Sequence, residues 1–352
     1  MTGVDPVLVD RLRELPDWPR ARLVVAPTPI HPLARLSAEL DGPEVWIKRD
    51  DLTGLAGGGN KTRKLEFLVG DALATGADTL LTVGAIQSNH TRQTAAAAAK
   101  VGLGCALLHN SWTPDAGEYY RGVGNILLSD LLGARLYYDA LARPIDDQGR
   151  LEELGDLLRE EGRRPYVIPG GGSDHQLGGF GYVACAAEIV AQANELEIGF
   201  DYIVHCTGSS GTQAGLIAGL AALGSPTRVI GVADDGETDG KRARILRLAA
   251  ATLRELGESQ TVAHGDVRVI AADPNPYGIA GPETIDALRL FARLEGLVAD
   301  PVYEGKAVRG LIELVARGEL LHGDRVLLLH LGGTPAVHAY ANHLRRGGLV
   351  EL

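Results

Sequence analysis

The stretch GLAGGGNKTRKLEF, residues 54–67, joins a glycine-rich turn to a lysine at the start of a helix-forming segment. It is close to the nucleotide phosphate-binding loop G-x-x-x-x-G-K-[ST], because four residues separate Gly54 from Gly59 and a Lys-Thr pair follows. However, Asn60 stands between the second glycine and Lys61, and the motif requires those two residues to be adjacent. The pattern therefore indicates that this lysine has a partner other than a nucleotide phosphate.

Short apolar runs alternate with helix-forming segments along the rest of the chain. Residues 77–85 (ADTLLTVGA) predict a buried strand, and residues 88–102 (SNHTRQTAAAAAKVG) predict a helix after it. Further strands are predicted at CALLHN, PYVIPGGGS, DYIVHCTGSSG, RVIGVADD and DRVLLLHLGG, and helices at SDLLGARL, LEELGDLLREEGRR and KRARILRLAAATLRELG. This alternation predicts an α/β fold with parallel sheets covered on both faces. In such sheets ligands bind at the carboxyl ends of the strands, where most of these runs reach glycines.

Composition excludes several classes of function. The chain of 352 residues is long enough for two lobes, and its net charge of −11 matches neither nucleic acid nor an anionic membrane surface. The three cysteines, Cys105, Cys185 and Cys206, lie in apolar runs without metal-ligand spacing, which favours buried thiols in a reducing compartment and no metal. No run approaches the roughly 20 apolar residues of a spanning helix, and residues 1–20 lack a signal-peptide core. We expect a cytoplasmic protein.

Three strand–turn–helix junctions carry candidate binding groups. At the first, Ser88, Asn89 and His90 open a helix, whose free N–H groups and dipole favour an anion. An ordinary N-cap explains the same residues. At the second, the loop Thr207–Thr212 offers hydroxyls and backbone donors to a phosphate but has no lysine of its own. The third, residues 329–340 (LHLGGTPAVHAY), repeats the strand, glycine and helix pattern.

Two further loops each place a tyrosine beside a glycine, Tyr277 in NPYGIAGPET and Tyr303 in DPVYEGKAVRG. Taken singly, a loop tyrosine is most often a half-buried packing residue. Together, a lysine at a glycine turn, a separate phosphate loop and an anion-binding helix start indicate a cofactor with an aldehyde and a phosphate. Pyridoxal phosphate has both groups, since its aldehyde forms a Schiff base with lysine and its ring is an electron sink.

Six stretches resemble one family of such enzymes: KRDDLTGLAGGGNKTRKLEFL, GAIQSNHTRQTAA, PGGGSDHQLGGFGYV, GTQAGL, DPVYEGK and HLGGTPA. They are similar to the 1-aminocyclopropane-1-carboxylate deaminase and D-cysteine desulfhydrase family, from about Pro27 to the C-terminus. This resemblance implies the tryptophan-synthase-β-like fold (fold type II) of pyridoxal-phosphate enzymes, with two open parallel-sheet domains. It also implies a large cofactor domain of residues 1–63 and 177–352, a smaller inserted α/β domain of residues 64–176, a site between them and a homodimer.

The resemblance further implies a role for individual residues. The lysine in GGNKTRK would form the Schiff base, the next lysine would contact the phosphate, and the glutamate in DPVYEGK would face the pyridine nitrogen. The implied catalytic residues are Lys61, Ser88, Tyr277 and Tyr303. The implied cofactor-binding residues are Lys61, Lys64, Asn89, Thr207, Gly208, Ser209, Ser210, Gly211, Thr212, Glu304 and Leu331. The small amino-acid substrate would contact Ser88, Asn89, His90, Tyr277 and Tyr303.

The choice of substrate depends on a few positions. Glu304 and Leu331 resemble the deaminases, which open 1-aminocyclopropane-1-carboxylate to 2-oxobutyrate and ammonia. His90, GAIQ in place of GGIQ, and PYGIAGPET resemble D-cysteine desulfhydrases, which release pyruvate, sulfide and ammonia, or cysteate-type sulfo-lyases. A carboxylate at the pyridine nitrogen favours its protonated form, which cyclopropane opening needs more than loss of a thiolate does. We expect the deaminase, with the desulfhydrase or sulfo-lyase as the alternative. Trp112, His90 and His175 are each consistent with a site role or with packing.

Two other classes fit the residues less well. A binding protein without catalysis would not need a Schiff-base lysine together with Tyr277 and Tyr303. A P-loop nucleotidase would need the lysine directly after the glycine, and a strand-ending aspartate for magnesium.

Overall fold

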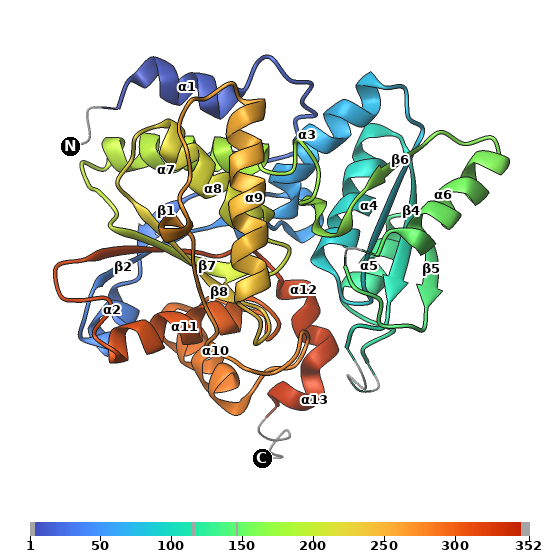
Figure 1. The fold of residues 1–352 in the computed structure, drawn as a ribbon. Coiled ribbons are helices and arrows are strands. Elements are labelled where there is room, and N and C mark those ends of the chain that lie inside the picture. Colours follow the sequence, from blue (N-terminus) through green and yellow to red (C-terminus); the bar gives the residue numbers. More distant parts are fainter. Residues whose placement is uncertain (1–3, 114–116, 118, 146, 346–352) are drawn as a thin grey trace.

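The computed structural model describes residues 4–113, 117, 119–145 and 147–345. Figure 1 shows two sheets side by side, each flanked by helices. The larger sheet has the strand order β1-β2-β10-β7-β8-β9, with β1 (Ile30–Pro32), β2 (Glu44–Lys48), β7 (Tyr202–Thr207), β8 (Arg228–Ala233), β9 (Arg268–Ile270) and β10 (Arg325–Leu329). The smaller sheet has the order β5-β4-β3-β6, with β3 (Thr79–Ala85), β4 (Gly104–Asn110), β5 (Arg135–Asp139) and β6 (Pro165–Ile168). All pairs are parallel except β1 with β2.

Helices cover both faces of each sheet. On the larger sheet, α1 (Pro6–Glu14), α7 (Phe180–Glu195), α8 (Gly211–Ala222) and α9 (Asp239–Glu255) lie on one side, and α2 (Ala34–Leu40), α10 (Pro282–Glu295) and α11 (Glu304–Ala316) lie on the other. On the smaller sheet, α3 (Lys61–Ala74) and α4 (Asn89–Val101) lie opposite α6 (Gly149–Glu160). The remaining helices are α5 (Asn125–Leu131), α12 (Thr334–Val337) and α13 (Ala341–Leu344). Among the described residues, no helix is both long and apolar enough to cross a membrane.

The central strands are mostly apolar because both of their faces are buried. In β10, Leu327 and Leu329 pack into the core under α7 and α8, whereas Val326 and Leu328 pack into the core under α10 and α11. Side chains alternate between the two faces of a strand, so a continuous apolar run is what a doubly covered parallel sheet requires. The runs in the sequence therefore predicted the sheets correctly.

The structure confirms the expected α/β fold with two parallel sheets, and it corrects one helix. Residues 129–136 (SDLLGARL) were expected to be helical, but α5 ends at Leu131 and β5 begins at Arg135. Gly133 has a φ of +81°, a left-handed conformation that ends the helix and turns the chain into the strand. The strands of the smaller sheet fall between residues 79 and 168, and the expected domain boundaries at residues 64 and 176 stay a prediction.

A buried ion-pair network fixes the start of α3 against the larger sheet. The Arg63 guanidinium contacts the Asp50 carboxylate at 2.8 Å and the Glu188 carboxylate of α7 at 3.0 Å. Glu188 also pairs with Lys48 at the end of β2, and the Tyr182 hydroxyl donates to Asp50 at 2.7 Å. Each charge is compensated, so the network holds three elements in one geometry without an unpaired buried ion.

Removing one charge from this network should destabilise the whole chain. Asp50→Ala leaves two cations, Arg63 and Lys48, with Glu188 as the remaining carboxylate, and breaking a buried pair costs about 3–5 kcal/mol. Urea denaturation should therefore show a large loss in the free energy of unfolding. Asp156→Ala, which removes an exposed pair with Arg159, is the control and should change little. Equal effects of the two substitutions would contradict this account.

Candidate active site

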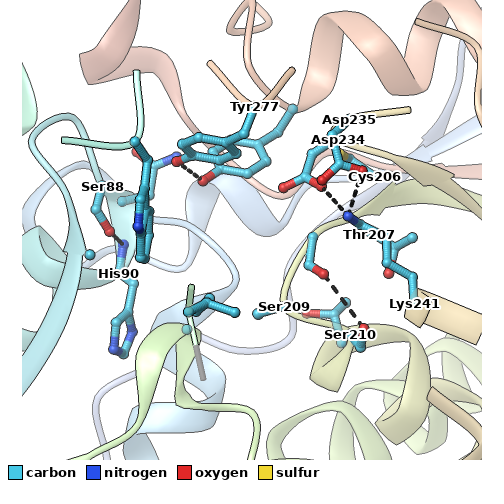
Figure 2. A pocket seen from close by; sticks show the side chains of 18 of the residues that line it. Ser88, His90, Cys206, Thr207, Ser209, Ser210, Asp234, Asp235, Lys241 and Tyr277 are labelled. Atoms are coloured by element: carbon cyan, nitrogen blue, oxygen red, sulfur yellow. Dashed lines mark hydrogen bonds and ion pairs between the residues drawn. The ribbon is translucent and has the colours of Figure 1, made fainter. Parts of the chain in front are cut away.

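A cavity of about 550 Å³ lies where the strands of both sheets end. Figure 2 shows Ser88 and His90 on one side of this cavity and Ser209 and Ser210 on the other, with Tyr277 above them. The predicted site residues at its wall are Lys61, Ser88, Asn89, His90, Thr207, Gly208, Ser209, Ser210, Thr212, Tyr277, Tyr303, Glu304 and Leu331. The structure thus brings together segments from six parts of the chain. Lys64 and Gly211 lie behind the wall.

The glycine turn ahead of α3 sets the position of Lys61. Gly57, Gly58 and Gly59 have φ values of +85°, +67° and +124°, and a Cβ on Gly58 would lie 1.9 Å from the Asp51 carbonyl oxygen. Only glycine fits such a turn. It delivers Lys61 to the first position of α3, where its Nζ donates to the hydroxyl of the phosphate loop's Ser209 at 3.4 Å.

The electrostatic setting of Lys61 suits a nucleophile. Burial lowers the pKa of Lys61 to about 8, and the nearby Asp234 carboxylate opposes this shift. An amine with a pKa near 8 is partly neutral at physiological pH, and the neutral form is the one that attacks a carbonyl.

The loop between β7 and α8 is the predicted phosphate loop. Ser210 adopts a φ of +72°, which turns the chain into α8. The Ser209 hydroxyl lies 2.8 Å from the Ser173 hydroxyl, and the buried Lys64 donates to Ser173 at 2.9 Å and to the Gly171 carbonyl at 3.2 Å. Lys64 therefore supports the loop through Ser173, one layer behind the cavity wall. Burial, followed by the charge of the neighbouring lysine, holds the pKa of Lys64 well below its usual range.

At the start of α4, Ser88 is an N-cap in the ordinary sense. Its Oγ accepts from the N–H groups of His90 at 3.1 Å and Thr91 at 3.2 Å. Two of the donors expected to face an anion are therefore already used by this side chain. Asn89, the first helical residue, accepts at Oδ1 from the amide of Asn125 at 2.9 Å.

His90 has a defined tautomer. The Thr82 hydroxyl donates its single proton to the Ile168 carbonyl at 2.7 Å, so it can only accept from His90 Nε2, which lies 2.8 Å away. The proton is thus on Nε2, and Nδ1 is a buried acceptor with no hydrogen-bond partner among the described residues. Burial holds the pKa of His90 well below its usual range, and the ring is neutral.

Tyr277 and Tyr303 meet at the cavity, with their hydroxyl oxygens 2.5 Å apart. Burial raises the pKa of both phenols, so both are protonated at neutral pH. Trp112 packs edge-on against Tyr277 with ring centroids 6.0 Å apart, and its indole N–H donates to the Arg143 carbonyl. Trp112 therefore belongs to the cavity wall. His175 lies outside the wall, where its Nε2 contacts the Tyr166 hydroxyl at 3.1 Å.

Asp300, which sequence reasoning missed, holds the turn that presents Tyr303 and Glu304. Its carboxylate accepts from the N–H groups of Val302 at 2.8 Å, Tyr303 at 2.9 Å and Glu304 at 3.2 Å. Burial raises the pKa of Asp300 to about 6, and these N–H groups limit the shift. An aspartate a few residues before a helix is a capping signal, so the motif DPVYEG could have indicated this contact.

Glu304 turns a carboxyl group into the interior with one oxygen unused. No described residue donates to its Oε1, and burial raises the pKa of Glu304 well above its usual range. On the far side of the cavity, Lys241 contacts Asp234 at 3.0 Å and Asp235 at 2.6 Å. A Cβ on Gly208 would lie 2.3 Å from Asp234 Oδ2, so this ion pair offsets a carboxylate directly beside the phosphate loop.

The residues present fit pyridoxal phosphate. The amine of Lys61 would hold the aldehyde, the start of α8 would hold the phosphate, and the oxygen of Glu304 without a described partner would hold the ring nitrogen. Within the described part of the chain, no three His, Cys, Asp or Glu side chains are grouped to hold a metal ion. The three cysteines are free and buried.

Comparison with known proteins defines the class. Residues 21–332 match the family of pyridoxal-phosphate dependent enzymes, and the chain belongs to that family. Its cofactor is accordingly pyridoxal phosphate. The expected fold type II architecture is confirmed by the same match and by related structures.

Individual relatives narrow the class. The chain is 46% identical to a 1-aminocyclopropane-1-carboxylate deaminase of Burkholderia cenocepacia over 333 residues, which is 94% of this chain and 98% of the relative. It is 45% identical to the enzyme of that name from Methylobacterium nodulans over 338 residues, covering 95% and 100%. A crystal structure of an ACC deaminase homologue superposes with a TM-score of 0.86 at 37% identity, covering 97% of this chain and 98% of the other. A solved threonine deaminase, at 20% identity and a TM-score of 0.62 over 94% of this chain and 98% of the other, shares the fold.

The lowered pKa of Lys61 makes covalent cofactor capture pH-dependent. Below the pKa the amine is protonated and cannot attack, so the attachment rate should rise with pH through about 8 and then level off. Absorbance changes after mixing apoprotein with pyridoxal phosphate between about pH 6 and 10 would measure it. Lys61→Ala is the control and should form no covalent bond. A midpoint at the ordinary lysine value of 10.5 would contradict the assigned environment.

Proposed function

We propose that this enzyme opens the ring of 1-aminocyclopropane-1-carboxylate and releases 2-oxobutyrate and ammonia. The contact between Tyr277 and Tyr303 is the observation that carries the proposal, because it places two protonated hydroxyls in the same cavity as Lys61 and Glu304. A cyclopropane has no ordinary leaving group, so its opening calls for both a strong electron sink and a group that acts at the ring carbons. The names of the curated relatives support the same activity.

In this proposal Lys61 binds the cofactor and then moves protons. When bound, pyridoxal phosphate supplies an aldehyde and an electron-withdrawing ring. A pKa near 8 would let the Lys61 amine, when it is not bonded to the cofactor, accept and return a proton at neutral pH. Lys64 would act on the phosphate loop through Ser173.

Glu304 is proposed to hold a proton at the ring nitrogen. Its buried carboxyl has one oxygen without a partner among the described residues, and the raised pKa of Glu304 means that a proton is readily shared at this site. A protonated ring nitrogen draws electrons more strongly, which cyclopropane opening requires. Asp300 keeps Glu304 and Tyr303 on one rigid turn.

The substrate carboxylate is proposed to bind at the start of α4. The Asn89 N–H, the Ser88 hydroxyl and the helix dipole lie at the wall there. This places the ring methylenes toward the tyrosine pair, where Tyr303, together with Tyr277, attacks or protonates the opening ring. The resemblance to the family further supports a homodimer in the cytoplasm, which stays a prediction.

The second candidate is D-cysteine desulfhydration, or a related sulfo-lyase reaction, with removal of the α-proton by Lys61. One observation favours it: the His90 ring at the cavity wall is neutral, and its Nδ1 is an acceptor without a described partner. The deaminases that this chain resembles typically have glutamine at this position. The products would be pyruvate, sulfide and ammonia in the case of D-cysteine.

A single hydroxyl tests the proposed chemistry. Tyr303→Phe should lower the rate of 2-oxobutyrate formation by about 100-fold or more, since proton transfer by a positioned side chain contributes roughly 10²–10⁴-fold. The visible spectrum of the bound cofactor should be unchanged. Tyr166→Phe, which removes a hydroxyl bonded to Asp71 away from the cavity, is the matched control and should retain full activity. Full activity of Tyr303→Phe would refute the role of this hydroxyl.

The substrate itself is decided by a side-by-side assay of the purified holoenzyme. We expect 2-oxobutyrate from 1-aminocyclopropane-1-carboxylate to exceed pyruvate and sulfide from D-cysteine. Dominant sulfide would overturn the deaminase proposal, and would show that Glu304 and Leu331 do not suffice to select the cyclopropane substrate.

A further inference from the structure

We propose that Arg92 and Gln93 of α4 position Lys61 through hydrogen bonds to the residues before and after it. They lie one turn beyond Ser88, on the helix whose start is proposed to bind the substrate carboxylate. The inference rests on the proposed role of Lys61 and adds two residues that contact neither the cofactor nor the substrate.

Arg92 holds the residues before Lys61. Its guanidinium is fully buried and donates to the carbonyls of Ala56 and Gly58, the latter at 3.0 Å, and to Asn125 Oδ1 at 2.7 Å. Ala56 has a φ of +45°, so the carbonyls that Arg92 binds belong to a turn in a costly left-handed conformation. The fork of the guanidinium suits two carbonyls on one turn, which a lysine could not bind in the same way.

Burying the Arg92 guanidinium costs free energy, which indicates that the position has a role besides packing. None of its acceptors in the described part of the chain is a carboxylate, and burial lowers the pKa of Arg92 to about 10. A buried cation compensated only by carbonyl and amide oxygens is disfavoured in a fold that needs packing alone. Holding a strained turn in place accounts for it.

Gln93 holds the residue after Lys61. Its Oε1 accepts from the Thr62 N–H at 2.8 Å and from the Thr62 hydroxyl at 3.0 Å, and its amide donates to the Asn89 carbonyl at 3.0 Å. A Cβ on Gly59 would lie 2.7 Å from the Gln93 amide nitrogen, so this side chain also covers the turn. The N–H groups at a helix start lack intrahelical partners, and Gln93 supplies one for α3.

Asn125 completes the connection to the substrate side. It accepts from Arg92 and donates to Asn89 Oδ1 at 2.9 Å and to the Gln87 carbonyl at 2.9 Å. The turn follows strand β2 of the larger sheet, whereas α4 covers the smaller sheet. The hydrogen bonds of Arg92, Gln93 and Asn125 thus fix the distance between Lys61, which follows the larger sheet's β2, and Asn89, at the start of α4 on the smaller sheet.

The test measures Lys61 with the cofactor alone, independently of any substrate. Arg92→Met and Gln93→Met remove the hydrogen bonds at similar length, and Arg92→Lys restores the charge and part of the bonding. Each variant is mixed with pyridoxal phosphate, reduced with borohydride and digested, and the modified fraction of Lys61 is measured by mass spectrometry from about pH 6 to 10. Ser37→Ala is the control, because its hydroxyl donates to the Leu33 carbonyl and accepts from the Val45 N–H of β2, where α2 meets the larger sheet and away from the residues of the cavity wall.

We expect both methionine variants to need about tenfold more cofactor for half-modification. Their pH midpoint should move upward from about 8, since a loosened Lys61 gains water and approaches its ordinary value of 10.5. Arg92→Lys should recover part of the affinity, and Ser37→Ala should match the wild type.

Two results would overturn the proposal in different ways. If the folded Arg92→Met and Gln93→Met proteins match the wild type in both affinity and pH midpoint, these two residues do not position Lys61, while the proposed function is unaffected. If the wild type itself carries no cofactor on Lys61, the proposed function fails, and the inference fails with it. Should Arg92→Met not fold, the Gln93→Met protein decides the outcome.

Discussion

Glycine turns that meet backbone to backbone are the constraint on which the rest of the site depends. A Cβ on Gly332 would lie 2.8 Å from the Gly59 Cα, and one on Gly171 would lie 2.4 Å from the Ser209 Oγ. The loop after β10 can therefore approach the turn before α3, and the loop after β6 can approach the loop after β7, closely enough to enclose a small ligand. A side chain at any of these positions would push a wall of the cavity outward, and Lys61 would lose its place opposite the phosphate loop.

Near these turns lie several buried ionisable side chains whose charged forms are disfavoured. Lys61 and Lys64 have lowered pKa values and Glu304 has a raised one, each chiefly because burial disfavours the charged form. Such shifts concentrate where a group must hold or give up a proton at neutral pH. The compensated network of Arg63 and Asp50 is the opposite case, because there every ion has a partner and the role is to hold α3 still.

The sequence predicted the fold well where local pattern and tertiary packing agree. The strand at residues 77–85 and the helix after Ser88 are both present, because a doubly buried strand and an N-capped helix leave strong local signals. The helix expected over residues 129–136 failed because a single left-handed glycine outweighed an amphipathic pattern. The sequence pattern did not predict helices α10 and α11, since the segments around their first residues were interpreted as loops that present Tyr277 and Tyr303. The candidate site residues were predicted mainly through resemblance to the family. Lys61 and Glu304 stand in short motifs far apart in the sequence, and no local pattern predicts that both line one cavity. Arg92 acts on Ala56 and Asn125 from more than 30 positions away, and no local pattern encodes such a contact.

Asp300 also gives the cavity a direction. Its carboxylate already occupies the start of α11 and takes the N–H groups there, so a second anion is repelled from that end and a phosphate is left with the start of α8. In the proposed arrangement Glu304 would then hold the ring nitrogen and Lys61 the aldehyde. Three unlike attachment points would admit a flat ring in one orientation, so one of its two faces would meet the Lys61 amine. The stereochemistry of every proton that this lysine moves would then be set before any substrate arrives.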